Sequence, residues 1–98
     1  MPNFDLRYHP KFFKDLEKLT KNQLEAVHNK IERIKQNPEQ FKDLKGKNNC
    51  HTVRIENMRL VYYFDGLNLW FLILESRKDV YELYLKRLYS LRMKLQEG

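Results

Sequence analysis

The sequence predicts an α+β fold, in which an antiparallel-rich, four-stranded sheet carries a helical hairpin packed on one face. Three observations lead to this fold class. Residues 3–8 alternate like a strand, residues 10–36 carry two helical patterns, and residues 50–75 carry three strand patterns before a last helical segment. A chain of 98 residues has the size of one domain, so we expect residues 1–98 to form a single domain.

The first strand and the first helix are expected within residues 3–19. Polar and apolar residues alternate over residues 3–8, which places Phe4, Leu6 and Tyr8 on one strand face. Pro10 suits the first turn of a helix, where a backbone N–H has no partner in any case. The apolar residues that follow at helical spacing are Phe12, Phe13, Leu16 and Leu19.

A second helix is expected to begin after Thr20, a good N-terminal capping residue, and to end at Asn37 and Pro38. The end lies there because the residue before a proline disfavours the helical conformation. The short turn near Thr20 predicts that the two helices form an antiparallel hairpin. The apolar stripe of the second helix contains Leu24, Val27, Ile31 and Ile34. We expect residues 38–49 to form a loop.

Three strands are expected to follow as a meander, over residues 50–56, 59–65 and 68–75. Asp65 and Gly66 are a strong signal for the tight turn between the second and third strands. The third strand is apolar on both faces, which is typical of a central strand. A last helix is expected over about residues 80–96, with its apolar side on the sheet and its basic side in solvent. We expect a functional site on the sheet face opposite the helical hairpin.

Composition and charge narrow the classes of function. Lys and Arg total 19 against 13 Asp and Glu, which gives a formal net charge of +6 and indicates a polyanionic partner. The longest apolar run, residues 69–74, is far too short to span a membrane, and the N-terminus has no apolar signal region. A single cysteine, Cys50, cannot form an internal disulfide. We therefore expect a cytoplasmic protein with no membrane partner.

Three arginines from consecutive strands are the candidates for a phosphate site. Arg54 and Arg59 flank a short turn, and Arg77 follows the last strand. Arginine holds phosphate oxygens bidentately and stays charged at any working pH. Tyr81, one helical turn after Arg77, is a candidate for proton transfer or base stacking. The alternatives stay open: solvated arginines at strand ends, and a tyrosine that only begins the apolar side of the last helix.

Residues 3–81 resemble the RelE/ParE toxins of bacterial and archaeal toxin–antitoxin pairs. The resemblance depends on the order of the elements and on three local patterns found in the same order. These are residues 44–46 (Leu-Lys-Gly) leading into residues 50–55, residues 59–63 (Arg-Leu-Val-Tyr-Tyr), and the Arg-x-x-x-Tyr pattern of residues 77–81.

The resemblance implies a RelE-like toxin: a ribosome-dependent, metal-independent endoribonuclease that cleaves mRNA in the ribosomal A site and arrests translation. It implies a cognate antitoxin, the ribosome and mRNA as partners, with no cofactor, no metal and no small-molecule ligand. The implied catalytic residues are Arg54, Arg59, Arg77 and Tyr81. The residues expected to contact RNA or the ribosome are Lys45, Lys47 and His51.

One departure from the family pattern keeps other functions open. RelE-type members carry two lysines on the strand that here holds Thr52 and Arg54. Proton transfer would then fall to another group, with His51 and Glu56 nearby, although strand alternation puts His51 on the packed face. One alternative is a ParE-like inhibitor of DNA gyrase without nuclease chemistry. Another is a catalytically silent relative that binds only RNA or an antitoxin.

Overall fold

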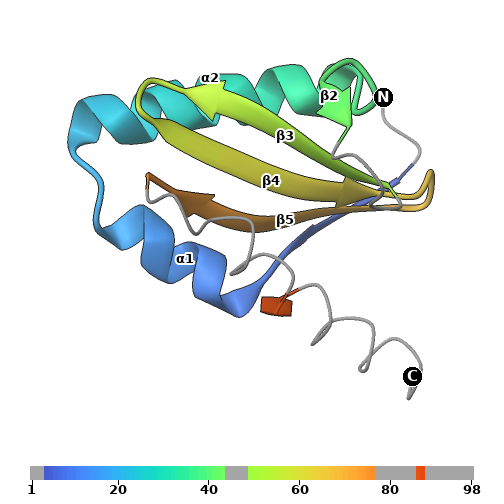
Figure 1. Cartoon of the computed structure of the whole chain (residues 1–98), viewed down its shortest axis with the longest axis horizontal. Coiled ribbons are helices and arrows are strands. Elements are labelled where there is room, and N and C mark those ends of the chain that lie inside the picture. The colour runs from blue at the N-terminus through green and yellow to red at the C-terminus, as the bar shows by residue number, and fades with distance from the viewer. Residues whose placement is uncertain (1–3, 44–48, 77–85, 88–98) are drawn as a thin grey trace.

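A computed structural model of the chain describes residues 4–43, 49–76 and 86–87. Its strands and helices follow the predicted order, with one short strand added (Figure 1). The elements are β1 (Asp5–Tyr8), α1 (Pro10–Glu17), α2 (Lys21–Gln36), β2 (Lys42–Asp43), β3 (Cys50–Ile55), β4 (Met58–Phe64) and β5 (Asn68–Glu75). Within the described ranges, no helix is long and apolar enough to cross a membrane.

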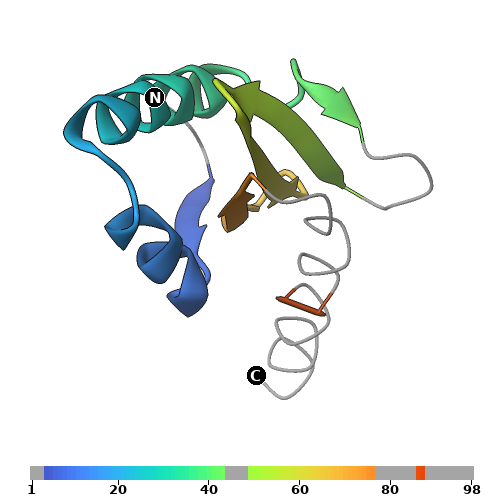
Figure 2. The same cartoon turned by 60° about the vertical axis from the view of Figure 1, so that its left-hand side comes forward.

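The strands form one sheet in the order β1-β5-β4-β3-β2. Strand β1 runs parallel to β5, and the other neighbouring strands are antiparallel. Helices α1 and α2 lie on the same side of this sheet (Figure 2), which confirms the predicted fold class. The prediction of a loop over residues 38–49 is wrong at Lys42–Asp43, which pair with β3 as a fifth strand. Two residues are too few to show alternation, so this strand leaves no pattern in the sequence.

Local capping interactions fix where the two helices begin. At α1, the Nδ1 atom of His9 accepts a hydrogen bond of 3.1 Å from the backbone N–H of Lys11. At α2, Thr20 and Gln23 form a reciprocal capping box, with hydrogen bonds of 3.2 and 2.9 Å. The cap at Asn37 ends α2, so both predicted boundaries of this helix are confirmed.

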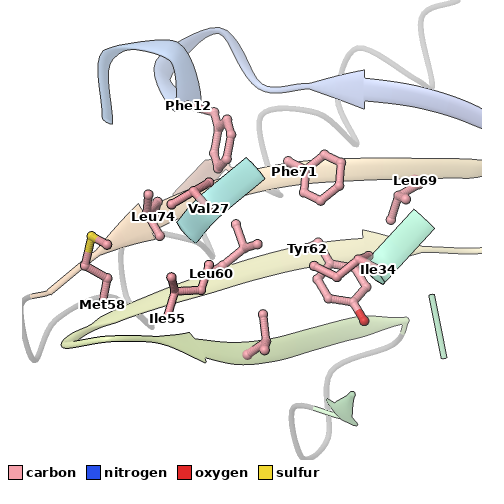
Figure 3. Packing of buried hydrophobic residues seen from close by; sticks show 11 residues of the cluster. Phe12, Val27, Ile34, Ile55, Met58, Leu60, Tyr62, Leu69, Phe71 and Leu74 are labelled. Atoms are coloured by element: carbon pink, nitrogen blue, oxygen red, sulfur yellow. The ribbon is translucent and has the colours of Figure 1, made fainter. Parts of the chain in front are cut away.

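The main core fills the space between the helices and the sheet (Figure 3). The expected helical stripes are only partly buried, because Phe13 and Leu24 are 52% and 40% exposed. Phe13 follows the fully buried Phe12 and therefore lies about 100° further round the helix. The buried residues of this core are Phe12, Val27, Ile34, Val53, Ile55, Met58, Leu60, Tyr62, Leu69, Phe71 and Leu74.

The opposite face of the sheet is also buried at its centre. Four side chains there have no exposed surface, and Tyr63 and Trp70 pack against them. They are Cys50, Val61, Leu72 and Ile73. The predicted helix over residues 80–96 lies outside the described residues except for Lys86 and Arg87, which are helical. The expectation that its basic side lies in solvent is wrong for Arg87, whose side chain is 13% exposed and contacts Asp15.

Asp65 organises the turn between β4 and β5 through three hydrogen bonds. Its Oδ1 atom accepts from the backbone N–H groups of Leu67 and Asn68 at 2.9 and 2.7 Å. Its Oδ2 atom accepts from the Tyr63 hydroxyl at 3.0 Å. Gly66 takes a φ of +91°, a conformation that favours glycine. The predicted tight turn at Asp65 and Gly66 is therefore confirmed.

The turn predicts an acid-dependent loss of stability. Partial burial opposes the ionisation of Asp65, but the hydrogen bonds from Asn68, Leu67 and Tyr63 together hold its pKa below the ordinary value. The unfolded chain thus binds the proton first as the pH falls. The contribution of Asp65 is fully present above about pH 4 and is lost as the pH falls through the lower, folded-state pKa.

We expect the free energy of unfolding of the wild-type protein to exceed that of Asp65→Asn above about pH 4, and this difference to shrink at lower pH. Urea titrations between pH 2 and 7 measure both curves. A difference that stays constant across this range would contradict the assignment.

Candidate functional site

Arg54 and Arg59 lie side by side on the sheet face opposite the two helices. They are Cα partners in the antiparallel pair β3–β4, next to the turn at Glu56 and Asn57. Strand alternation puts Val53 and Ile55 on the helix-covered face and Arg54 on the other. The structure therefore brings together two of the three arginines that the sequence analysis selected.

The turn itself orients Arg54. The Nε atom of Arg54 donates a hydrogen bond of 3.0 Å to the backbone carbonyl of Glu56. Glu56 has a φ of 56°, in the left-handed region that is unfavourable for residues with a side chain. The Arg54 side chain is exposed, and this hydrogen bond uses only its Nε atom.

Arg59 is half-buried and has two cross-strand neighbours, one of which carries the same charge and the other the opposite charge. Arg54 is its partner on β3, and Glu75 is its partner on β5. Glu75 accepts a hydrogen bond of 3.0 Å from the backbone N–H of Ser76. Within the part of the chain that the structure describes, no carboxylate forms an ion pair with Arg54 or Arg59. Like charges placed directly opposite on a sheet destabilise it, so an anion that binds both would relieve the repulsion.

Two further residues beside the arginines escaped the sequence analysis. Glu75 is the Cα partner of Arg59. Its place at the end of the third predicted strand is the sequence feature that could have revealed it. Lys42 is the Cα partner of Thr52 on the short strand β2. No sequence signal reveals Lys42, because its strand was expected to be a loop. The register thus puts a lysine position directly beside the strand position where RelE-type sequences carry one.

Thr52 is nearly buried, at 5% exposure, on the same face as Arg54. Its hydroxyl oxygen has no hydrogen-bond partner among the described residues. A threonine hydroxyl carries no charge, so Thr52 supplies neither a cation nor an acid–base group near pH 7.

His51 lies on the other face of β3, away from the two arginines. Its ring stacks on Tyr62 with centroids 5.0 Å apart, and it is 5% exposed. The Nδ1 atom lies 3.1 Å from the carbonyl oxygen of Phe41. The structure gives His51 a packing position, because alternation along β3 turns it toward the helices, and its expected contact with RNA or the ribosome stays a prediction.

The other predicted site residues lie outside the described residues. They are Lys45, Lys47, Arg77 and Tyr81. Arg77 follows Ser76 directly and is two positions beyond Glu75, the cross-strand neighbour of Arg59. Among the described residues, no cluster of three or more His, Cys, Asp or Glu side chains could hold a metal ion.

The fold is shared with several solved toxin structures. A mutant of the E. coli toxin RelE in the free state superposes with a TM-score of 0.74 at 21% identity, over 87% of this chain and 97% of that one. The RelE–RelB complex from Pyrococcus horikoshii gives 0.63 at 18% identity, over 78% and 97%. The YoeB dimer from Staphylococcus aureus gives 0.63 at 19% identity, over 76% and 98%. The chain therefore has the RelE-like α+β fold.

The sequence identifies the family within this fold. Residues 6–81 match the model of the ParE toxin of the type II toxin–antitoxin system, parDE. The chain belongs to this family of toxins, and so to the RelE/ParE superfamily that the three sequence patterns indicated. No curated protein matches the sequence.

The strained turn beside Arg54 gives a stability prediction. Glycine at position 56 removes the steric cost of the positive φ, so we expect Glu56→Gly to raise the free energy of unfolding by up to about 1 kcal/mol. Asn57 does not have a positive φ, so Asn57→Gly should instead lower it by about 0.5–1 kcal/mol. Urea unfolding of both variants tests this. If both substitutions lowered the free energy of unfolding by the same amount, that result would contradict strain at Glu56.

Proposed function

We propose that this toxin is a ribosome-dependent, metal-independent endoribonuclease that cleaves mRNA in the A site and arrests translation in the cytoplasm. The observation that carries the proposal is the direct opposition of Arg54 and Arg59 on one sheet face. Within the described residues, no carboxylate forms an ion pair with either of them, although Glu75 is the cross-strand neighbour of Arg59. Two arginines at directly paired strand positions suit a phosphate that gains negative charge during the reaction.

The chemistry needs no cofactor. The 2′-hydroxyl of the nucleotide attacks the neighbouring phosphorus, the bond to the 5′-oxygen breaks, and a cyclic phosphate and a free 5′-hydroxyl result. Catalysis requires an oriented substrate, a base for the 2′-hydroxyl, a proton for the leaving oxygen and cations for the extra charge. Arg54 and Arg59 supply the cations, and we assign Arg77 to the same phosphate on the basis of the family pattern.

Proton transfer is the demanding step at this site. Arg54 is too weak an acid to exchange protons readily, and Thr52 carries no suitable group. We assign the proton transfer to Tyr81, on the basis of the Arg-x-x-x-Tyr pattern. Lys42 holds the strand position opposite Thr52 in the register. Lys45 and Lys47 remain our candidates for contacts with the ribosome or the RNA backbone.

A cognate antitoxin is the expected protein partner. The RelE toxin of Pyrococcus horikoshii was solved as a complex with RelB, and the RelB–RelE structure from Methanococcus jannaschii is an antitoxin–toxin complex. We infer that an antitoxin neutralises the present toxin too, with acidic residues directed at the arginines. Such complementarity of charge also accelerates association.

The first test removes the cations one at a time. We expect Arg54→Met and Arg59→Met each to reduce mRNA cleavage about 100-fold, as is typical for the loss of one group that stabilises transition-state charge. Reconstituted translation with primer extension maps the cleavage at A-site codons.

The matched control is Arg7→Met. Arg7 is an exposed arginine on the edge strand β1, which does not pair with β3 or β4, and it forms an ion pair with Asp5. It should cleave like the wild type. Cleavage that persists in both site variants would refute the proposed role of the arginines.

A second candidate function is inhibition of DNA gyrase. Two observations favour it: the family match is to the ParE toxin, and Thr52 replaces a strand lysine. In that case purified gyrase should lose supercoiling activity at micromolar toxin, and Arg59→Met should inhibit as strongly as the wild type. Inactivity in both assays, combined with salt-dependent RNA binding, would instead indicate a silent relative.

A further inference from the structure

Strand β1 forms one edge of the sheet, and no described strand pairs with its outer side (blue in Figure 2). The backbone N–H of Asp5 donates to the carbonyl of Leu67 at 2.9 Å, on the side of β5. Backbone groups alternate in direction along a strand, so those of Asp5 and Arg7 point toward β5. Those of Leu6 and Tyr8 point to the outer edge, where such a row of donors and acceptors is a template for another strand.

The charged side chains of β1 carry opposite signs at positions two residues apart. Asp5 and Arg7 lie on the face opposite the helices, where their side chains are 73% and 52% exposed and form an ion pair of 3.5 Å. Charges on an edge strand ordinarily prevent pairing with other chains. Because these two charges have opposite signs, they oppose pairing in some registers and favour it in others.

The charges select one register for pairing between β1 and the same strand of a second copy. When Leu6 lies opposite Leu6 of the second copy, the outward backbone groups of the two leucines can exchange both hydrogen bonds. Each Asp5 then lies opposite an Arg7. A shift by two residues in one direction sets the two Asp5 residues opposite each other, and a shift in the other direction does the same to the two Arg7 residues. Directly opposed like charges destabilise a sheet, and opposite charges stabilise it.

An apolar strip borders the same edge on the helix-covered face, formed by Leu6, Tyr8 and Phe13. Leu6 is the Cα partner of the core residue Leu69 and is 36% exposed. The ring of Tyr8 lies 5.6 Å from that of Phe13, which is 52% exposed. A two-fold axis perpendicular to the sheet keeps the helix-covered faces of both copies on the same side, so the two apolar strips meet there. Their burial would add hydrophobic stabilisation to the backbone hydrogen bonds.

We propose that this toxin forms a symmetric dimer in which the β1 strands of two copies pair antiparallel, with Leu6 opposite Leu6 and Asp5 opposite Arg7. The two sheets join into one, and β5 separates the interface from β4 and β3 in each copy. Arg54 and Arg59 therefore stay outside the interface. A strand of four residues buries less than the roughly 1,200 Å² of a standard interface, so the dimer is a weak one. The inference does not depend on the proposed nuclease function.

Sedimentation equilibrium of the full-length protein, at concentrations up to about 1 mM, measures the association. We expect the average mass of the wild type to rise from that of one chain toward that of two. Asp5→Arg sets two arginines opposite each other, and Arg7→Asp sets two aspartates opposite each other, so each variant should associate at least about tenfold more weakly. The control Glu25→Arg changes the net charge as much as Asp5→Arg, but on an exposed position of α2, and should dimerise like the wild type.

An equal mixture of Asp5→Arg and Arg7→Asp separates strand pairing from any damage to the fold. In the mixed dimer the introduced arginine faces the introduced aspartate, and the remaining Arg7 faces the remaining Asp5. We expect association to return to within about threefold of the wild type. Mixing does not restore the ion pair within each chain, so a role confined to the single chain cannot give this result. A mixture that associates no better than its components would overturn the inference. A wild type that stays monomeric throughout would also overturn it and leave the edge to a strand from another protein.

Amide hydrogen exchange measured by NMR locates the interface and its register. The N–H of Leu6 gains a partner only in the dimer, whereas that of Arg7 already points toward β5 in the single chain. We expect the exchange of the Leu6 amide to slow at least about tenfold between dilute and concentrated wild type, and that of Arg7 to change little. In Asp5→Arg, the Leu6 amide should exchange at the dilute rate at both concentrations. A dimer that leaves the Leu6 amide unprotected would use another surface of the protein, and the inference would be wrong.

Discussion

The register of the β3–β4 hairpin is the constraint on which the rest of the structure depends. With only Glu56 and Asn57 between the strands, each residue of β3 faces one fixed partner on β4. A slip by one residue would turn every side chain to the other face. Val53 and Leu60 would then leave the core, and Arg54 and Arg59 would enter it. The burial of the apolar partners therefore enforces the exposure of the charged ones.

This coupling explains how a small domain can hold two repelling cations together. The core residues on the helix-covered face are almost completely buried, and hydrophobic burial contributes about 25 cal/mol per Å² of apolar area. The repulsion between two arginines at a half-exposed site is small in comparison, since solvent screens it. The unfavourable contact can persist in the free protein and be relieved when a polyanion binds.

Most of the fold follows from patterns that a single sequence contains. Thr20 and Pro38 bracket α2, and Asp65 with Gly66 marks the last hairpin, because capping and turn formation are local. The neighbouring positions of Arg54 and Arg59 were also predictable from the short turn between two alternating strands. What the sequence does not reveal depends on distant partners. Lys42 gains its place by pairing with β3, and Arg87 becomes buried by pairing with Asp15 on α1.

The irregularity in β5 has a consequence for how the protein tolerates insertions and deletions. Val61 pairs with Ile73 and Tyr62 pairs with Phe71, so Leu72 is an extra residue in this strand. The bulge reverses which residues of β5 face the helices. Before it, the odd-numbered Leu69 and Phe71 lie in the helix-side core. After it, the even-numbered Leu74 lies there, and Ile73 lies on the other face. The strand is apolar on both faces because each face is buried in a core. The extra residue sets the face of Glu75, which pairs with Arg59; without the bulge, Glu75 would lie on the helix-covered side. Deletion of that one residue would leave the composition almost unchanged and yet turn the carboxylate of Glu75 away from Arg59 and toward the helices.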